Sequence, residues 1–378
     1  MTEQTQRCET VIIGGGQAGL SVGYHLKKQG RSFVILDGSR QVGDSWRGRW
    51  DSLRLYSPAF RDGLPGMPFP APKNTYPTKD EMGDYLQAYA TRFALPVQTG
   101  TPVEALNKDN GRYVAVTADK RFVADNVVVA TGVFRKPYTP SFAGELDPRI
   151  TQLHSNDYRD PSQLQDGLVL VVGASHSGSD LAHEASASHD VVLSGPDTGQ
   201  LPVPIESRRG RVGFRLLVFA GTHILTVDTP LGRKMRPHVR HGGGPLLRYR
   251  RKELRAAGVE RVVGHTTGVE RGRPVLSDGR VVEARNVIWC TGFRPDFSWI
   301  HFPFEVGDDG FPVQYRGAAA SSTGLYFAGL PFLHSFASMF ITGAGRDAER
   351  IASQIGRERE PLVWNGRLEE PAGLDVVK

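Results

Sequence analysis

The sequence predicts an α/β protein made of two units, each built on a parallel β-sheet. A glycine-rich loop follows an apolar, strand-like run near the N-terminus, and a second such loop follows another apolar run about 160 residues later. A helical pattern and a further apolar run come after each loop. This order of strand, glycine loop, helix and strand is typical of dinucleotide binding. Two such units in 378 residues indicate two dinucleotides, with electron transfer between them.

The bulk composition fits a globular protein of two domains. Hydrophobic residues make up 39% of the chain, and no apolar run approaches the roughly 18 to 20 residues that span a bilayer. The two cysteines, Cys8 and Cys290, form no C-x-x-C pair, which argues against a disulfide scaffold, a zinc ribbon and a redox dithiol. The first ten residues are polar and show no signal-peptide pattern. We therefore expect a cytoplasmic protein without a metal site.

The first loop has the full pattern of a dinucleotide site. Residues 11–13 form a strand, G-x-G-x-x-G follows, and a second strand at 32–36 ends in an acid. The first glycine permits the tight turn, the second lets the backbone approach a pyrophosphate, and the third lets helix and strand pack closely. The helix N-terminus binds the phosphates, and the acid accepts hydrogen bonds from ribose hydroxyls. The predicted contacts are Gly14, Gly16, Gln17, Ala18, Gly19 and Asp37.

The segment that follows carries a family resemblance. Residues 43–47 read Gly-Asp-Ser-Trp-Arg, and residues 50–58 read Trp-Asp-Ser-Leu-Arg-Leu-Tyr-Ser-Pro. At this point the chain resembles the flavin-dependent monooxygenases with two Rossmann-like domains, which include flavin-containing monooxygenases, YUCCA-type enzymes and, most similar here, bacterial CzcO-type proteins. The resemblance implies FAD at the first loop, with Gly43, Ser45, Trp46 and Arg47 along the flavin.

The second loop departs from the glycine pattern at its middle position. It reads Gly173-x-Ser175-x-Ser177-Gly178, and serine is small enough for close backbone approach to a phosphate. The resemblance implies NADPH or NADH here, held by Gly173, Ser175, His176, Ser177 and Gly178. The turn at 194–199 lacks the arginine that usually pairs with a 2′-phosphate, so Arg208 and Arg209 are candidates from further on. The family and the basic insert favour NADPH, and NADH stays open.

The resemblance implies that glycines at two strand ends mark the crossings between the units. Ala130-Thr131-Gly132 ends one strand, and Thr291-Gly292 ends another. The resemblance implies that the chain returns near its C-terminus to close the FAD domain, with Gly329, Phe340 and Gly343 near the flavin. We therefore predict two Rossmann-like domains. The FAD-binding domain comprises 1–138 and 284–378, and the NAD(P)H-binding domain (139–283) is inserted in it.

Three side chains are candidates for the chemistry. Phe142-Ala143-Gly144 followed by His154 and Tyr158 resembles a monooxygenase fingerprint, although the spacing to the histidine is longer than the pattern allows. We favour His154 as a histidine that fixes the domain junction over one that takes part in chemistry. Several relatives stabilise the oxygen adduct with an asparagine. Here that region offers Tyr56 or Ser57 instead.

The insert at about 205–255 is strongly basic. It holds thirteen Lys or Arg between Arg208 and Arg255, against two acids. We favour a solvated surface, with an anion-attracting face or weak contact with a membrane surface left open. No nucleic-acid motif is present. An apolar stretch from Phe214 to Val227 is expected to be a buried helix, with a lid, a dimer contact or an interfacial helix as alternatives, and Gly242–Gly244 would allow a hinge.

The resemblance implies a monooxygenase reaction. NAD(P)H would reduce FAD, and the reduced flavin would react with O₂ to give a C4a-(hydro)peroxyflavin. This species would oxygenate a small nucleophilic (S or N) or carbonyl substrate. Two alternatives remain: an NAD(P)H oxidase or reductase that releases H₂O₂, and a non-enzymatic flavin redox sensor. A homodimer is plausible, and the sequence does not indicate which substrate is used.

Overall fold

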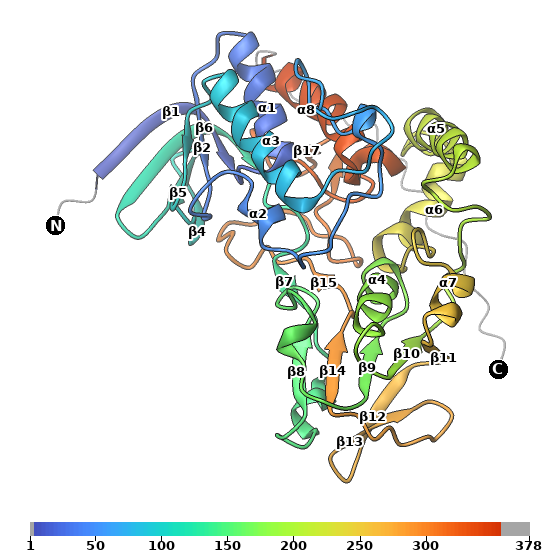
Figure 1. The fold of residues 1–378 in the computed structure, drawn as a ribbon. Helices are drawn as coiled ribbons and strands as arrows, with labels where there is room; N and C mark the ends of the chain where they lie inside the picture. The colour runs from blue at the N-terminus through green and yellow to red at the C-terminus, as the bar shows by residue number, and fades with distance from the viewer. Residues whose placement is uncertain (1–3, 357–378) are drawn as a thin grey trace.

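A computed structural model describes residues 4–356 and shows two larger sheets with helices beside them, one mixed and one parallel (Figure 1). In the larger sheet the strands lie in the order β16-β17-β18-β6-β1-β2-β3, and the β4–β5 hairpin extends β6. Its strands are β1 (Gln4–Ile13), β2 (Phe33–Leu36), β3 (Val97–Gln98), β4 (Ala105–Asp109), β5 (Arg112–Val116), β6 (Lys120–Val129), β16 (Gln314–Tyr315), β17 (Ala318–Ala319) and β18 (Leu325–Phe327). The β1 strand pairs in parallel with β2 and β6, and β18 pairs in parallel with β6.

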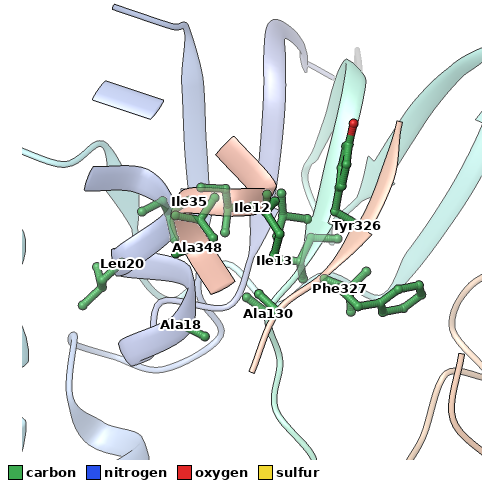
Figure 2. Close-up of a cluster of buried hydrophobic side chains, with 14 of the residues drawn as sticks. Ile12, Ile13, Ala18, Leu20, Ile35, Ala130, Tyr326, Phe327 and Ala348 are labelled. Atoms are coloured by element: carbon green, nitrogen blue, oxygen red, sulfur yellow. The ribbon is translucent and has the colours of Figure 1, made fainter. Parts of the chain in front are cut away.

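Helices α1 (Gln17–Lys28), α3 (Lys79–Arg92) and α8 (Ile341–Gly356) belong to this unit, with the short helices α2 (Asp44–Arg47), η1 (Ala59–Arg61) and η4 (Phe336–Met339). Figure 2 shows part of this core, where Ile12 of β1, Ile35 of β2 and Ala348 of α8 lie close together. All three side chains are buried. Strand β18 and helix α8 therefore complete a sheet and core that begin some 300 residues earlier in the chain.

The smaller sheet has five parallel strands in the order β11-β10-β9-β14-β8. They are β8 (Thr151–His154), β9 (Val169–Val172), β10 (Val191–Gly195), β11 (Glu260–Val263) and β14 (Asn286–Trp289). Helix α4 (His176–Ala185) follows β9 and packs its buried side chains, Leu181 and Ala182, into the core of this unit. The remaining elements are β7 (Lys136–Pro137), η2 (Ser141–Glu145), η3 (Pro161–Gln163), the hairpin of β12 (Thr266–Glu270) and β13 (Arg273–Leu276), and β15 (Phe293–Arg294).

The sheets locate the crossings between the units. Strand β14 pairs with β8 and β9, although its residues lie beyond position 283. Strands β7 and β15 pair with each other between the two sheets. A boundary after β14, near residue 290, therefore describes the sheets better than one at 284.

The insert forms three helices, α5 (Arg208–His223), α6 (Pro230–His241) and α7 (Arg251–Ala256). The expectation of a buried helix between Phe214 and Val227 is wrong. Only Gly210 and Gly221 of α5 are buried, and Leu216 is 67% exposed. The helix lies at the margin of the ribbon, beside α6 (Figure 1).

Candidate dinucleotide sites and the junction between them

The first glycine loop packs tightly at its two ends and is open at its middle. Gly14 has a φ of +112°, and a Cβ there would lie 2.5 Å from the carbonyl oxygen of Ala130. A Cβ on Gly19 would overlap the carbonyl oxygen of Gly14. A Cβ on Gly16 would meet nothing within 4 Å. The end glycines are therefore required by packing, and the space at Gly16 fits the approach of a pyrophosphate to the N-terminus of α1, where Gln17 and Ala18 begin the helix.

Asp37 lies directly after β2 and faces this loop. Its Oδ2 accepts a hydrogen bond of 2.5 Å from the backbone N–H of Gly15, and its Oδ1 accepts one of 2.7 Å from Ser39. These bonds fix the carboxylate at the edge of the loop, 22 positions from Gly15. This is the place where an acid can accept hydrogen bonds from a ribose.

The segment 43–47 forms the short helix α2 beside α1. The indole N–H of Trp46 donates to Oε1 of Gln17 at 3.3 Å, which ties α2 to the first turn of α1. The guanidinium of Arg47 donates to the carbonyl of Val42 and pairs with Asp84 at 2.8 Å. Arg47 thus holds α2 against α3, whereas Ser45 is exposed.

The second loop repeats the geometry of the first. Gly173 has a φ of +107°, a Cβ there would overlap the carbonyl oxygen of Cys290, and a Cβ on Gly178 would overlap the carbonyl oxygen of Gly173. The carbonyl of Cys290 therefore crowds the first glycine of the second loop in the same way that the carbonyl of Ala130 crowds the first glycine of the first loop. The hydroxyl of Ser175 donates to the carbonyl of Gly244 at 2.9 Å. The serine that replaces the middle glycine is therefore bonded to the insert, and Ser177 lies in the first turn of α4.

His176 is enclosed between the second loop, the insert and the first unit. Its ring lies 5.4 Å from that of Tyr56, and a Cβ on Gly244 would overlap the imidazole. Within residues 4–356, its Nε2 has no hydrogen-bond partner. Burial lowers the pKa of His176 to about 4, so the ring is neutral at pH 7.

The turn after β10 has arginines that the sequence did not indicate. Arg251 of α7 pairs with Asp197, and Arg261 of β11 donates to the carbonyls of Leu193, Gly195 and Pro196. Arg208 and Arg209 lie exposed at the start of α5. The missed arginines follow the turn by more than fifty residues, and only the pairing of β10 with β11 brings Arg261 to it.

The two crossings lie next to each other, and His154 joins them. Its Nε2 donates to the carbonyl of Gly292 at 3.0 Å, and its Nδ1 accepts from the backbone N–H of Asn156 at 3.1 Å. The backbone N–H of Tyr138 donates to the same carbonyl at 2.9 Å, and the hydroxyl of Thr291 donates to the carbonyl of Tyr138. Burial lowers the pKa of His154. Both ring nitrogens bind backbone, which fits a histidine that fixes the junction.

The crossing that lies beside the first glycine loop consists of Ala130, Thr131 and Gly132. The backbone N–H of Ala130 donates to the carbonyl of Ile13 at 2.8 Å, so this crossing starts beside the first glycine loop. In the returning segment, a Cβ on Gly329 would lie 2.9 Å from that of Ala18. A Cβ on Gly343 would overlap the carbonyl oxygen of Ala337, and Phe340 is 40% exposed. The structure thus brings Gly329 to the start of α1.

The hydroxyls of Tyr56 and Ser57 both donate to buried carboxylates. Tyr56 donates to Oδ2 of Asp180 at 2.8 Å, and Ser57 donates to Oδ1 of Asp62. Arg248 reaches the same Oδ2 of Asp180 at 3.3 Å. Burial raises the pKa of Asp180 to about 6, although Arg248 lowers it, and burial raises the pKa of Asp62 to about 7. Sequence reasoning missed both acids; a charged residue at a buried position of α4 was the available signal for Asp180.

A cavity of about 340 Å³ lies where the two units and the insert meet. Ser52 and Arg54 line it from the first unit, Asp180 and His183 from α4, and Arg248 from the insert. Across the described range, no cluster of His, Cys, Asp and Glu side chains is arranged to hold a metal ion. Asp180 and Arg248, which pair with each other, therefore both border this cavity.

Comparisons with known proteins agree with this architecture. The family described as "Pyridine nucleotide-disulphide oxidoreductase" matches residues 11–200. The "Uncharacterized oxidoreductase CzcO-like" of Geobacillus kaustophilus is 38% identical over 348 residues, which are 92% of this chain and 98% of that protein. "Probable indole-3-pyruvate monooxygenase YUCCA7" of Arabidopsis thaliana is 30% identical over 91% of this chain and 86% of its own length.

Solved structures resemble the whole described fold. A flavin-containing monooxygenase from Stenotrophomonas maltophilia superposes with a TM-score of 0.75 at 28% identity, covering 93% of this chain and 98% of that one. The bacillithiol disulfide reductase of Staphylococcus aureus superposes with a TM-score of 0.69 at 16% identity, covering 94% of this chain and 100% of its own, and shows the fold alone.

Proposed function

The chain belongs to the flavin-containing monooxygenase-like family of pyridine nucleotide-dependent oxidoreductases, and from this premise we propose that it is an FAD-dependent, NADPH-consuming monooxygenase. Its substrate would be a small molecule with a nucleophilic sulfur or nitrogen, or with a carbonyl group. The observation that carries the proposal is the pair of glycine loops. Both are closed at their ends in the same way, and each opens onto the N-terminus of a helix.

We assign FAD to the first loop. The open space at Gly16 admits a pyrophosphate, the N-terminal amides of α1 would bind it, and Asp37 would bind the ribose. When bound, the flavin would take a hydride from the nucleotide and activate dioxygen. The protein would bind and orient the two cofactors and exclude water from the site. Trp46 and Gln17 fix the segment beside the loop, and Gly329 brings the returning chain against α1.

We assign NADPH to the second loop. Arg251 is the group that would pair with a 2′-phosphate at the turn after β10, in exchange for Asp197. The side chain is exposed, so the exchange needs no rearrangement of the core. Arg261 donates to two carbonyls of β10 and to that of Pro196 in the turn, and would hold the start of the turn in place while the phosphate binds.

In this proposal, Tyr56, Ser57 and His154 position other groups and do not take part in the chemistry themselves. Each hydroxyl is committed to a carboxylate, and both imidazole nitrogens of His154 are committed to the backbone. No asparagine lies at 55–59. This specific feature favours a second candidate function, an NADPH oxidase that releases H₂O₂, because fewer donors are free to hold an activated oxygen.

One experiment separates the two functions. NADPH and NADH oxidation is measured with a panel of sulfides, amines and ketones, with oxygenated product and H₂O₂ quantified together. A monooxygenase gives product in proportion to NADPH consumed with some member of the panel. Stoichiometric H₂O₂ with every compound, and direct return of reduced flavin to its oxidised spectrum on exposure to oxygen, would establish the oxidase instead.

A further inference from the structure

The outer face of α5 is an apolar stripe without a partner in the described chain. Val212, Leu216 and Phe219 are 59%, 67% and 58% exposed. Their spacing of four and three positions aligns them along one side of the helix. Leu217, Ile224 and, from α6, Leu231 are also exposed. We call Val212, Leu216 and Phe219 the α5 face.

The opposite side of α5 is firmly attached, so the exposure does not reflect a detached helix. A Cβ on Gly221 would lie 2.9 Å from the ring of Phe336. Just beyond the helix, the backbone N–H of Val227 donates to the carbonyl of His334 at 2.8 Å, and that of Phe336 donates to Leu225 at 2.9 Å. The glycine side of α5 is therefore seated on the segment around η4, and the apolar side is presented outward.

Positive charge surrounds this face. Arg208, Arg209 and Arg215 of α5 and Arg233 and Lys234 of α6 are exposed. Between residues 208 and 241 there is one acid, Asp228, and it pairs with Arg316 at 2.9 Å. The face therefore combines exposed apolar side chains with exposed cationic ones, the composition of helices that lie in the plane of a membrane surface.

We propose that the α5 face is a docking surface for an anionic lipid bilayer. Its apolar side chains would enter the acyl boundary, and the arginines and Lys234 would bind the lipid phosphates. A second copy of the chain fits the face less well, since a two-fold contact through it would bring like charges from both copies together. No helix in residues 4–356 has the length and apolar character to cross a bilayer, so the contact is peripheral.

Helix α5 lies between the docking face and the segment 336–343. Phe340, 40% exposed, packs edge-to-face on Phe336 at 5.3 Å, and Phe336 lies beneath Gly221. The segment 336–343, which returns to the first unit, therefore lies against α5 on the side away from the docking face. A bilayer bound at this face would be separated from that segment by the helix alone.

The test is vesicle flotation of the full-length holoenzyme. Phosphatidylcholine vesicles are compared with the same vesicles containing phosphatidylglycerol, at low and high salt. We expect binding only to the anionic vesicles, weakened by salt. Leu216→Ser with Phe219→Ser should reduce binding by at least about tenfold. Arg209→Gln with Arg215→Gln should do the same without changing the apolar residues.

A matched double variant controls for the loss of exposed apolar side chains in general. Val263→Ser with Val306→Ser removes two that are 68% and 45% exposed elsewhere, and should leave flotation unchanged. Light scattering is measured in parallel. Self-association that Leu216→Ser with Phe219→Ser abolishes, without vesicle binding, would assign the face to a second copy and overturn the proposal. Absence of flotation with a monomeric holoenzyme would also overturn it.

A reporter on the face distinguishes lipid from the protein's own chain. An environment-sensitive dye on Leu216→Cys, in a Cys8→Ser background, should emit as in water and shift to the blue when anionic vesicles are added. Emission that is already blue-shifted without vesicles, and unchanged by them, would show that the chain itself covers α5 and would refute lipid docking.

Discussion

The phenolic hydroxyl of Tyr56 donates a 2.8 Å hydrogen bond to the carboxylate of Asp180, which lies 124 positions later in the other unit. Arg248 of the insert binds the same carboxylate oxygen and lies over the Tyr56 ring at 5.1 Å. Three segments that are distant in sequence are thus joined through one buried charge. Such a charge is costly unless its partners are all in place, so the cluster fixes how the units meet.

Removing the Tyr56 hydroxyl should therefore destabilise the junction. Tyr56→Phe is expected to lower the free energy of unfolding by about 1.5 to 3 kcal/mol, the usual contribution of a hydrogen bond to a charged group. Tyr315→Phe is the control, since Tyr315 donates to Asp228 at 3.1 Å on the surface and should cost much less. Equal losses in chemical denaturation would contradict the special role of the Tyr56 bond.

Asp62 gives a prediction for the pH dependence of stability. Burial raises the pKa of Asp62 to about 7, although the Ser57 hydroxyl lowers it. The folded state therefore holds a proton that the unfolded state releases near pH 4, and this stabilisation is lost as pH rises toward 7. Between pH 5.5 and pH 8 the free energy of unfolding of the wild type should fall by about 2 kcal/mol through this group. The same change in pH should cause no such loss in Asp62→Asn. Asp119→Asn, at an exposed carboxylate, should show the same loss as the wild type in thermal unfolding.

Gly16 should be needed for flavin and not for folding. A valine side chain would fill the open space where a pyrophosphate approaches the loop. Gly16→Val is expected to yield folded, colourless apoprotein. Gly144→Val, at another glycine with open space around it, should purify yellow. A yellow Gly16→Val holoenzyme with normal flavin content would refute the assignment of FAD to the first loop.

His154 should matter for the junction and not for proton transfer. His154→Ala removes the donor to Gly292 and should cost about 1 to 3 kcal/mol of stability. His154→Gln keeps a donor and should cost less. The pH profile of kcat should have the same shape in His154→Gln as in the wild type. Loss of one limb of that profile would instead identify His154 as an acid or base.

Arg251 should distinguish the two nucleotides. Arg251→Ala is expected to raise the KM for NADPH about tenfold, because a charged partner of the 2′-phosphate is lost, and to leave the KM for NADH nearly unchanged. Arg255→Ala, at an exposed arginine of the same helix, is the control. A parallel rise for both nucleotides would place Arg251 away from the 2′-phosphate.

The sequence predicted those parts of the fold that depend on local patterns. Both glycine loops, their flanking strands and the residues at the crossings are recognisable because steric limits at Gly14 and Gly173 leave few alternatives. Contacts between distant segments were not predictable. Asp180, Arg248 and Arg251 reach their partners only through tertiary packing. The buried helix expected after Phe214 was wrong because apolar content was taken for burial, and α5 carries its apolar side chains on the outside.

The bond from Ser175 to Gly244 links the second loop to the end of α6, which closes at His241. If a phosphate of the proposed dinucleotide took the proton of the Ser175 hydroxyl, the Gly244 carbonyl would lose its donor, and the bond between the loop and the insert would be exchanged for a bond to the ligand. Linkage of this kind is reciprocal. Under the proposed assignment, loss of the contact between residue 244 and the loop would favour nucleotide binding, and nucleotide binding would weaken that contact. The attachment of the insert would then report whether the second loop is occupied.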